Sequence, residues 1–125
     1  MQEFEFTVIF YENEDGTKPA KAFVLGLEPK MKVKMFRTID MLEKNGIELR
    51  EPYSKHLEDG IFELRAQVGS DISRVLYFFI VGRKVILTNG FIKKTQKTPP
   101  DEIKRAKDYR TLYLERLKRE ENSDE

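Results

Sequence analysis

The chain has 125 residues, of which 39% are hydrophobic and 36% are charged, and its formal net charge is +1. This length supports a single domain with a modest hydrophobic core, and the absence of cysteine excludes a disulfide framework and a cysteine–metal site. No apolar run resembles a signal peptide or is long enough to cross a bilayer, so we expect a cytoplasmic protein with no membrane segment.

The first half of the chain predicts one strand followed by a helical hairpin. Apolar and polar residues alternate over residues 4–10, which is the period of a half-buried strand. A short helix is predicted to begin at Pro19 with Thr17 as its cap, and a longer helix is predicted over residues 29–45. On the longer helix we expect a buried apolar stripe made of Val33, Phe36, Ile39 and Leu42. Residues 47–60 lack a clear period and are predicted to form a loop.

The second half predicts three antiparallel strands and a final helix. Residues 61–68 alternate, so the polar side chains of Glu63, Arg65 and Gln67 share one face. Residues 74–81 are almost continuously apolar, which is typical of a central strand buried on both faces. The chain returns over residues 85–91, and a last helix is predicted to start near Pro99, with Thr98 as its cap.

This order predicts an α+β fold: a small antiparallel sheet of about four strands, an N-terminal helical hairpin and a C-terminal helix. We expect one domain over residues 1–119 and an acidic, disordered tail over residues 120–125. The charge is unevenly distributed, because residues 1–60 carry a net charge of −3 and residues 61–119 carry +8. A polyanion would therefore meet the second half, although solvated surface charge is the simpler explanation for this pattern alone.

Three segments place cations near the ends of the predicted strands: residues 62–65 (FELR), 73–78 (SRVLYF) and 90–99 (GFIKKTQKTP). Together they resemble the RelE/HigB family of toxin–antitoxin toxins, in the HigB-like branch first described from a phage protein. The resemblance covers about residues 53–112. It implies the RelE-like fold, with helices on one face of the sheet and an open, concave opposite face.

The resemblance also implies an activity, which is endoribonuclease cleavage of mRNA that depends on the ribosome and inhibits translation. The implied reaction is metal-independent attack of a ribose 2′-hydroxyl on the adjacent phosphate, with no cofactor. It needs a base, cations for the developing charge and an acid for the 5′-oxygen. The implied partner is a helix-turn-helix, HigA-like antitoxin, with DNA bound only through the complex. Two alternatives are a non-catalytic member that binds antitoxin or RNA, and a gyrase-inhibiting toxin on the same fold.

The candidate catalytic cations follow from the matched segments. Arg74 matches the arginine that the family carries in the segment corresponding to SRVLYF. Its guanidinium could hold a phosphate at two points, although it could instead pair with Asp71 or Glu63. Arg65 matches a basic position of the preceding strand, and its alternative is a cross-strand salt bridge. Lys94 matches the position where relatives place a catalytic arginine.

The remaining candidates have less defined roles. Glu63 could be a base for the 2′-hydroxyl, but we favour a clamp that orients the two arginines. Several relatives carry a C-terminal Tyr or His, but the matching residues 95–100 contain neither, so the general acid is unassigned. His56, the only histidine, could take this role from the loop, or it could be an ordinary surface residue. An exposed Tyr53 could stack a base. Further candidates for contact with the RNA or its phosphates are Lys93, Lys97, Gln96 and Lys55, although Lys97 and Gln96 could equally be solvated loop residues.

Overall fold

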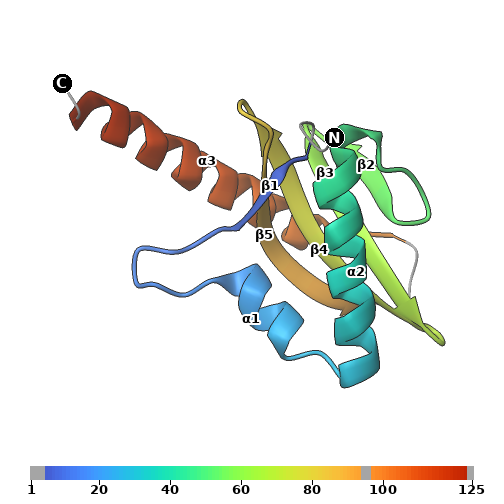
Figure 1. The fold of residues 1–125 in the computed structure, drawn as a ribbon. Coiled ribbons are helices and arrows are strands. Elements are labelled where there is room, and N and C mark those ends of the chain that lie inside the picture. Colours follow the sequence, from blue (N-terminus) through green and yellow to red (C-terminus); the bar gives the residue numbers. More distant parts are fainter. Residues whose placement is uncertain (1–4, 94–96, 124–125) are drawn as a thin grey trace.

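The structure is a computed structural model that describes residues 5–93 and 97–123. Within these residues, five strands form one sheet in the order β1-β5-β4-β3-β2 (Figure 1). The strands are β1 (Thr7–Phe10), β2 (Ser54–Glu58), β3 (Ile61–Val68), β4 (Asp71–Ile80) and β5 (Lys84–Lys93). Strand β1 runs parallel to β5 and the other neighbours are antiparallel. The predicted α+β class is confirmed.

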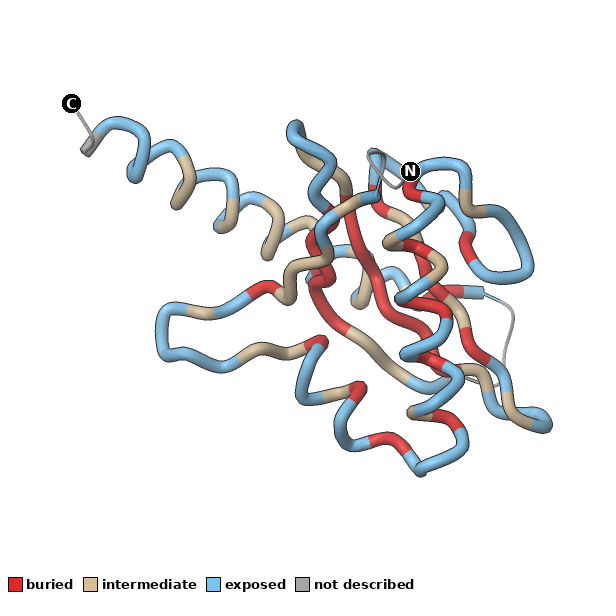
Figure 2. Tube along the Cα trace, viewed as in Figure 1, coloured by how far each residue is buried: buried red, intermediate tan, exposed pale blue. Residues whose placement is uncertain are grey.

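Helices cover both faces of this sheet. One face, which we call the hairpin face, is covered by α1 (Pro19–Leu25) and α2 (Pro29–Asn45), and a 3-10 turn, η1 (Gly46–Glu48), follows them. The opposite α3 face is covered at one end by α3 (Pro100–Ser123), which projects beyond the sheet (Figure 1). Buried segments follow the central strands between the two helical layers (Figure 2).

The buried face of α2 differs from the predicted stripe. Its buried residues are Met31, Met35, Thr38, Ile39 and Leu42, which pack on the hairpin face. Val33 and Phe36 are instead 50% and 40% exposed. A run of residues spaced by three rotates about 60° around a helix at each step, so it cannot stay on one face. Spacings of four and three together follow the period of the helix, and the methionines complete that pattern.

The predicted loop over residues 47–60 was wrong, because it contains η1 and the edge strand β2. Strand β2 pairs with β3 in a register that places Ser54 opposite Leu64 and Lys55 opposite Glu63. The sequence of β2 is mainly polar. An edge strand can be polar because backbone hydrogen bonds to its one neighbour hold it in place and one of its edges is exposed. The sheet therefore has one strand more than the roughly four predicted.

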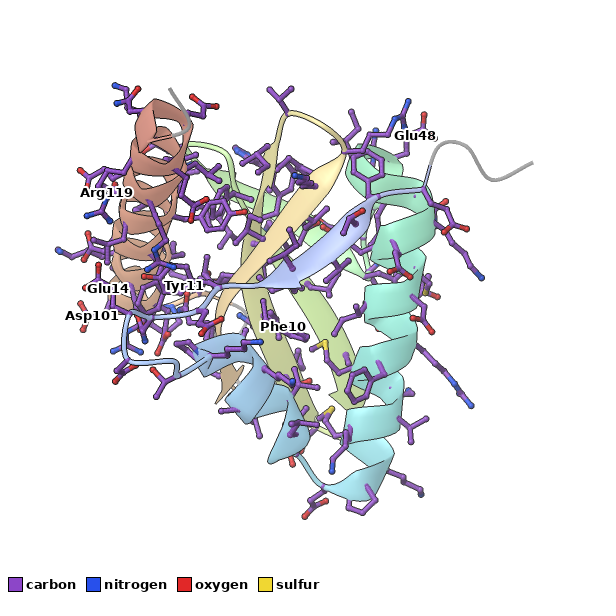
Figure 3. All side chains as sticks on the ribbon, turned by 60° about the vertical axis from the view of Figure 1, so that its left-hand side comes forward. Phe10, Tyr11, Glu14, Glu48, Asp101 and Arg119 are labelled. Carbon is purple, nitrogen blue, oxygen red and sulfur yellow. The ribbon has the colours of Figure 1, made fainter. Side chains whose placement is uncertain are left out.

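Helix α3 is held along the α3 face and continues to Ser123, so residues 120–123 are helical where we had expected a tail. The ring of Tyr11 stacks on Tyr109 with 4.6 Å between centroids. Further out, Arg119 Nη2 lies 3.8 Å from Glu14 Oε2, and Figure 3 shows Tyr11 and Glu14 beside the helix. None of the described helices combines the length and the apolar character needed to cross a membrane.

Candidate functional site

Four side chains meet between β3, β4 and the start of α3, and we call them the Glu63 cluster: Glu63, Arg65, Arg74 and Thr98. Side chains alternate along a strand, and Leu64 and Ala66 pack on the hairpin face, so Glu63 and Arg65 point to the α3 face. Arg74 lies directly opposite Arg65 in the β3–β4 ladder and thus shares that face.

The Glu63 carboxylate is held from three sides. Its Oε2 accepts a hydrogen bond from Arg65 Nε at 2.6 Å. Its Oε1 lies 3.6 Å from Arg74 Nη1 and accepts a short hydrogen bond from the Thr98 hydroxyl. The predicted alternative for Arg74, a pairing with Glu63, is thus present in the structure. Thr98 makes this contact with β3, while α3 begins at Pro100 with backbone bonds to Pro99.

Burial divides the cluster into an inner and an outer part. The side chains of Glu63 and Arg74 are 0% exposed, whereas that of Arg65 is 16% exposed. The open face implied by the family resemblance is therefore covered at this point, and among these cations Arg65 is the one that reaches solvent. Two guanidinium groups contact one carboxylate, and the outer one, Arg65, is the group of the cluster that a phosphodiester could meet.

Burial also affects the titration of the inner arginine. Desolvation lowers the pKa of the Arg74 guanidinium below its ordinary value, the Glu63 carboxylate raises it in part, and Arg65 lowers it. An arginine remains charged at any working pH even so. The Arg74 guanidinium therefore faces the Glu63 carboxylate at 3.6 Å, and both side chains are enclosed.

The other predicted residues lie in different places. Lys55 is exposed on β2 opposite Glu63, so its side chain shares the α3 face. His56 points to the hairpin face, where its ring meets Phe62 at 5.0 Å and its Nε2 accepts a bond from Gly60 N at 3.3 Å. The structure does not bring His56 to the cluster. Lys97 is exposed just before Thr98.

Two candidates cannot be placed. Lys94 and Gln96 lie outside the described residues. The backbone of Lys93 ends β5 opposite Ile72, and the side chain of Lys93 is also outside the described part of the structure. The roles predicted for these three residues therefore stay predictions.

Sequence reasoning missed a second polar group, which joins β5 to α3. Asn89 Nδ2 donates to Glu102 Oε1 at 3.0 Å, and the Thr88 hydroxyl donates to Asn89 Oδ1 at 2.6 Å. Both β5 residues are buried. The signal was a polar Thr-Asn pair inside an otherwise apolar strand, which is unusual unless both side chains have partners. This group holds α3 against β5, directly after the segment that contains Thr98.

Gly90, the first residue of the GFIKKTQKTP segment, has a packing role. A Cβ built at Gly90 would overlap the ring of Phe23 from α1. Glycine thus allows α1 to lie directly on β5, on the face opposite the Glu63 cluster. Within the described residues, no group of three or more acidic or histidine side chains is arranged to hold a metal ion.

Comparison with known families bears on this site. The family described as Phage derived protein Gp49-like (DUF891) matches residues 22–111, which include every strand but β1 and all described members of the Glu63 cluster. The chain belongs to the Gp49-like family. No curated protein matches the chain.

Membership of the Gp49-like family relates this protein to a broad class of toxins. The family is related to toxin–antitoxin toxins of the RelE/HigB kind, in agreement with the resemblance found in the three sequence segments. Such a relationship suggests a cognate antitoxin as a partner. The match covers the segments that position Glu63, Arg65 and Arg74, so the cluster belongs to the family domain.

Proposed function

We propose that this Gp49-like protein is the toxin of a type II toxin–antitoxin pair and that it cleaves mRNA on the ribosome. The 2′-oxygen of a ribose attacks the adjacent phosphorus, the bond from phosphorus to the 5′-oxygen breaks, and a 2′,3′-cyclic phosphate and a 5′-hydroxyl result. The proton leaves the 2′-hydroxyl and another reaches the 5′-oxygen through water. A HigA-like antitoxin would bind and neutralise the protein.

The observation that carries this proposal is the pair of arginines on one carboxylate within a basic half of the chain. In the proposal Arg65, the outer guanidinium, contacts the phosphate and stabilises the charge that develops on it. Glu63 is a clamp, because ion pairs and the Thr98 hydroxyl occupy its oxygens. Arg74 is a positioning residue: its guanidinium contacts Glu63 from the buried side of the cluster and adds positive electrostatic potential there.

One observation favours a second candidate, a non-catalytic member that binds RNA or antitoxin. The inner half of the cluster is closed to solvent, and the only histidine lies on the other face of the sheet. A protein that only binds would need the fold and the basic surface but no open cluster. Cleavage of RNA separates the two candidates directly.

The test is induction of the protein in bacteria with growth curves and mapping of RNA 5′ ends. Wild type should arrest growth and produce cuts inside translated codons, and Arg65→Ala should do neither at equal expression. The matched control is Arg119→Ala, which removes a guanidinium that is 67% exposed and far along α3. It should behave like wild type.

Three results would count against the proposal or a part of it. Growth arrest without RNA cuts would favour the binding candidate, and arrest with loss of DNA supercoiling would favour inhibition of gyrase. Full activity of Arg65→Ala would remove the outer guanidinium from the mechanism. Circular dichroism of each purified variant shows whether a lost activity reflects a lost fold.

A further inference from the structure

A cavity of about 440 Å³ lies between α2 and the edge of β3, next to the Glu63 cluster. Strand β2 begins at Ser54 opposite Leu64, Arg65 N donates to the Tyr53 carbonyl at 2.8 Å, and both Tyr53 and Arg65 line the cavity. Its lining includes Lys34 and Arg37 from α2, Tyr53 before β2, and Arg65 from β3.

The charge of this cavity is of one sign. Three of its lining residues, Lys34, Arg37 and Arg65, are cationic, and no lining residue is acidic. Lys34 Nζ donates to the Gln67 carbonyl at 2.8 Å, which draws the α2 side chain over the β3 edge. Arg37 is exposed and makes no side-chain hydrogen bond or ion pair with the described residues. An anionic ligand would therefore meet Lys34 and Arg37, for which the structure gives no carboxylate contact among the described residues, beside Arg65, which is paired with Glu63.

The cavity also offers an aromatic ring. Tyr53 lines it and is 42% exposed, and Met41 and Pro52 add apolar surface beside it. A planar ring with cations nearby is the combination that holds a nucleotide of a single strand, since the base stacks and the phosphate is paired. An acidic peptide would use the cations but would have less use for an exposed ring.

Arg65 connects the cavity with the Glu63 cluster. Arg65 is one of the residues that line the cavity, and its Nε is bonded to Glu63 Oε2 at 2.6 Å on the α3 face of the same strand edge. We propose that this cavity binds the nucleotide next to the phosphate held by Arg65, with its base on Tyr53 and its own phosphate at Arg37 and Lys34. This inference rests on the proposed function. It assigns part of a substrate subsite to α2, which contains none of the three cation-bearing sequence segments (residues 62–65, 73–78 and 90–99).

The test uses a short single-stranded RNA whose riboses are all 2′-O-methylated, so that it can bind but lacks the attacking hydroxyl. Fluorescence anisotropy with the full chain gives the Kd at several salt concentrations. Tyr53→Ala and Arg37→Ala should each weaken binding about tenfold. Tyr53→Phe should bind like wild type, and so should the control Lys21→Ala, which removes an exposed cation on α1.

Salt dependence distinguishes the two kinds of contact. Loss of one phosphate contact should reduce the slope of log Kd against log salt by about 0.7 in Arg37→Ala, whereas Tyr53→Ala should leave the slope unchanged. Unchanged Kd values for both variants, with wild type still cleaving mRNA, would overturn the subsite alone. Wild type that neither binds nor cleaves RNA would overturn the proposed function as well. Unchanged RNA binding with lost antitoxin binding would assign the cavity to the antitoxin and overturn the inference.

Discussion

Replacing the Glu63 carboxylate by an amide, in Glu63→Gln, should strongly destabilise the fold. The 3.6 Å between Glu63 Oε1 and Arg74 Nη1 corresponds to an attraction of about 5 kcal/mol at an effective dielectric constant of about 20. The amide removes this attraction and leaves the enclosed Arg74 without the Glu63 carboxylate. Breaking a buried pair in this way costs about 3–5 kcal/mol. The midpoint of thermal unfolding should fall by on the order of 10–20 °C.

Urea unfolding followed by circular dichroism measures this loss. The matched control is Asp108→Asn, the same chemical change in a pair with Lys104 whose side chains are 75% and 61% exposed. It should change the free energy of unfolding by less than about 0.5 kcal/mol. Adding Arg74→Met to Glu63→Gln should recover part of the loss, because no buried charge is then left uncompensated. A loss below about 1 kcal/mol for Glu63→Gln would refute this description of the cluster.

Three further predictions concern the core. Burial raises the pKa of Tyr77 from 10.0 to about 12, so the folded state keeps a proton that the unfolded state loses above pH 10. The free energy of unfolding should therefore fall by roughly 2–3 kcal/mol between about pH 10 and pH 12, and Tyr77→Phe should lack this decrease in urea titrations. Met35→Ala should lower the free energy of unfolding by about 2–5 kcal/mol in the same assay, and Val33→Ala should lower it by less than about 1 kcal/mol. The opposite order would favour the stripe predicted from the sequence, with Val33 buried. Gly90→Ala should cost about 1–3 kcal/mol because its Cβ would overlap Phe23, and an unchanged melting temperature would contradict that packing.

Much of the fold could be predicted because its central elements have unambiguous periods. Strand β3 occupies residues 61–68 as the alternation indicated, and α2 ends at Asn45 before Gly46, whose φ is +55°. The errors fell where periodicity is weak or ambiguous. The polar edge strand β2 has no apolar alternation to find, and its position depends on pairing with β3. Pairing between segments is a tertiary property that local patterns do not contain.

Three of the four members of the Glu63 cluster could be proposed from the sequence, but Thr98 and the burial of the cluster could not. Alternation along β3 correctly placed Glu63 and Arg65 on one face. The Glu63 carboxylate accepts a hydrogen bond from Thr98, which is 35 residues away from Glu63 in sequence and was expected only to cap a helix. Whether His56 could reach the cluster was likewise a question of register, and its place opposite Phe62 puts it on the other face.

The measurement that tests the central claim most directly is the chemistry of the RNA ends produced after induction. The proposed reaction leaves a 5′-hydroxyl on one fragment and a 2′,3′-cyclic phosphate on the other. The new 5′ ends inside translated mRNA should therefore be joined to an adaptor only by a ligation that requires a 5′-hydroxyl. These ends should be absent with Arg65→Ala. New ends that carry a 5′-phosphate, or growth arrest with no new ends, would contradict the account.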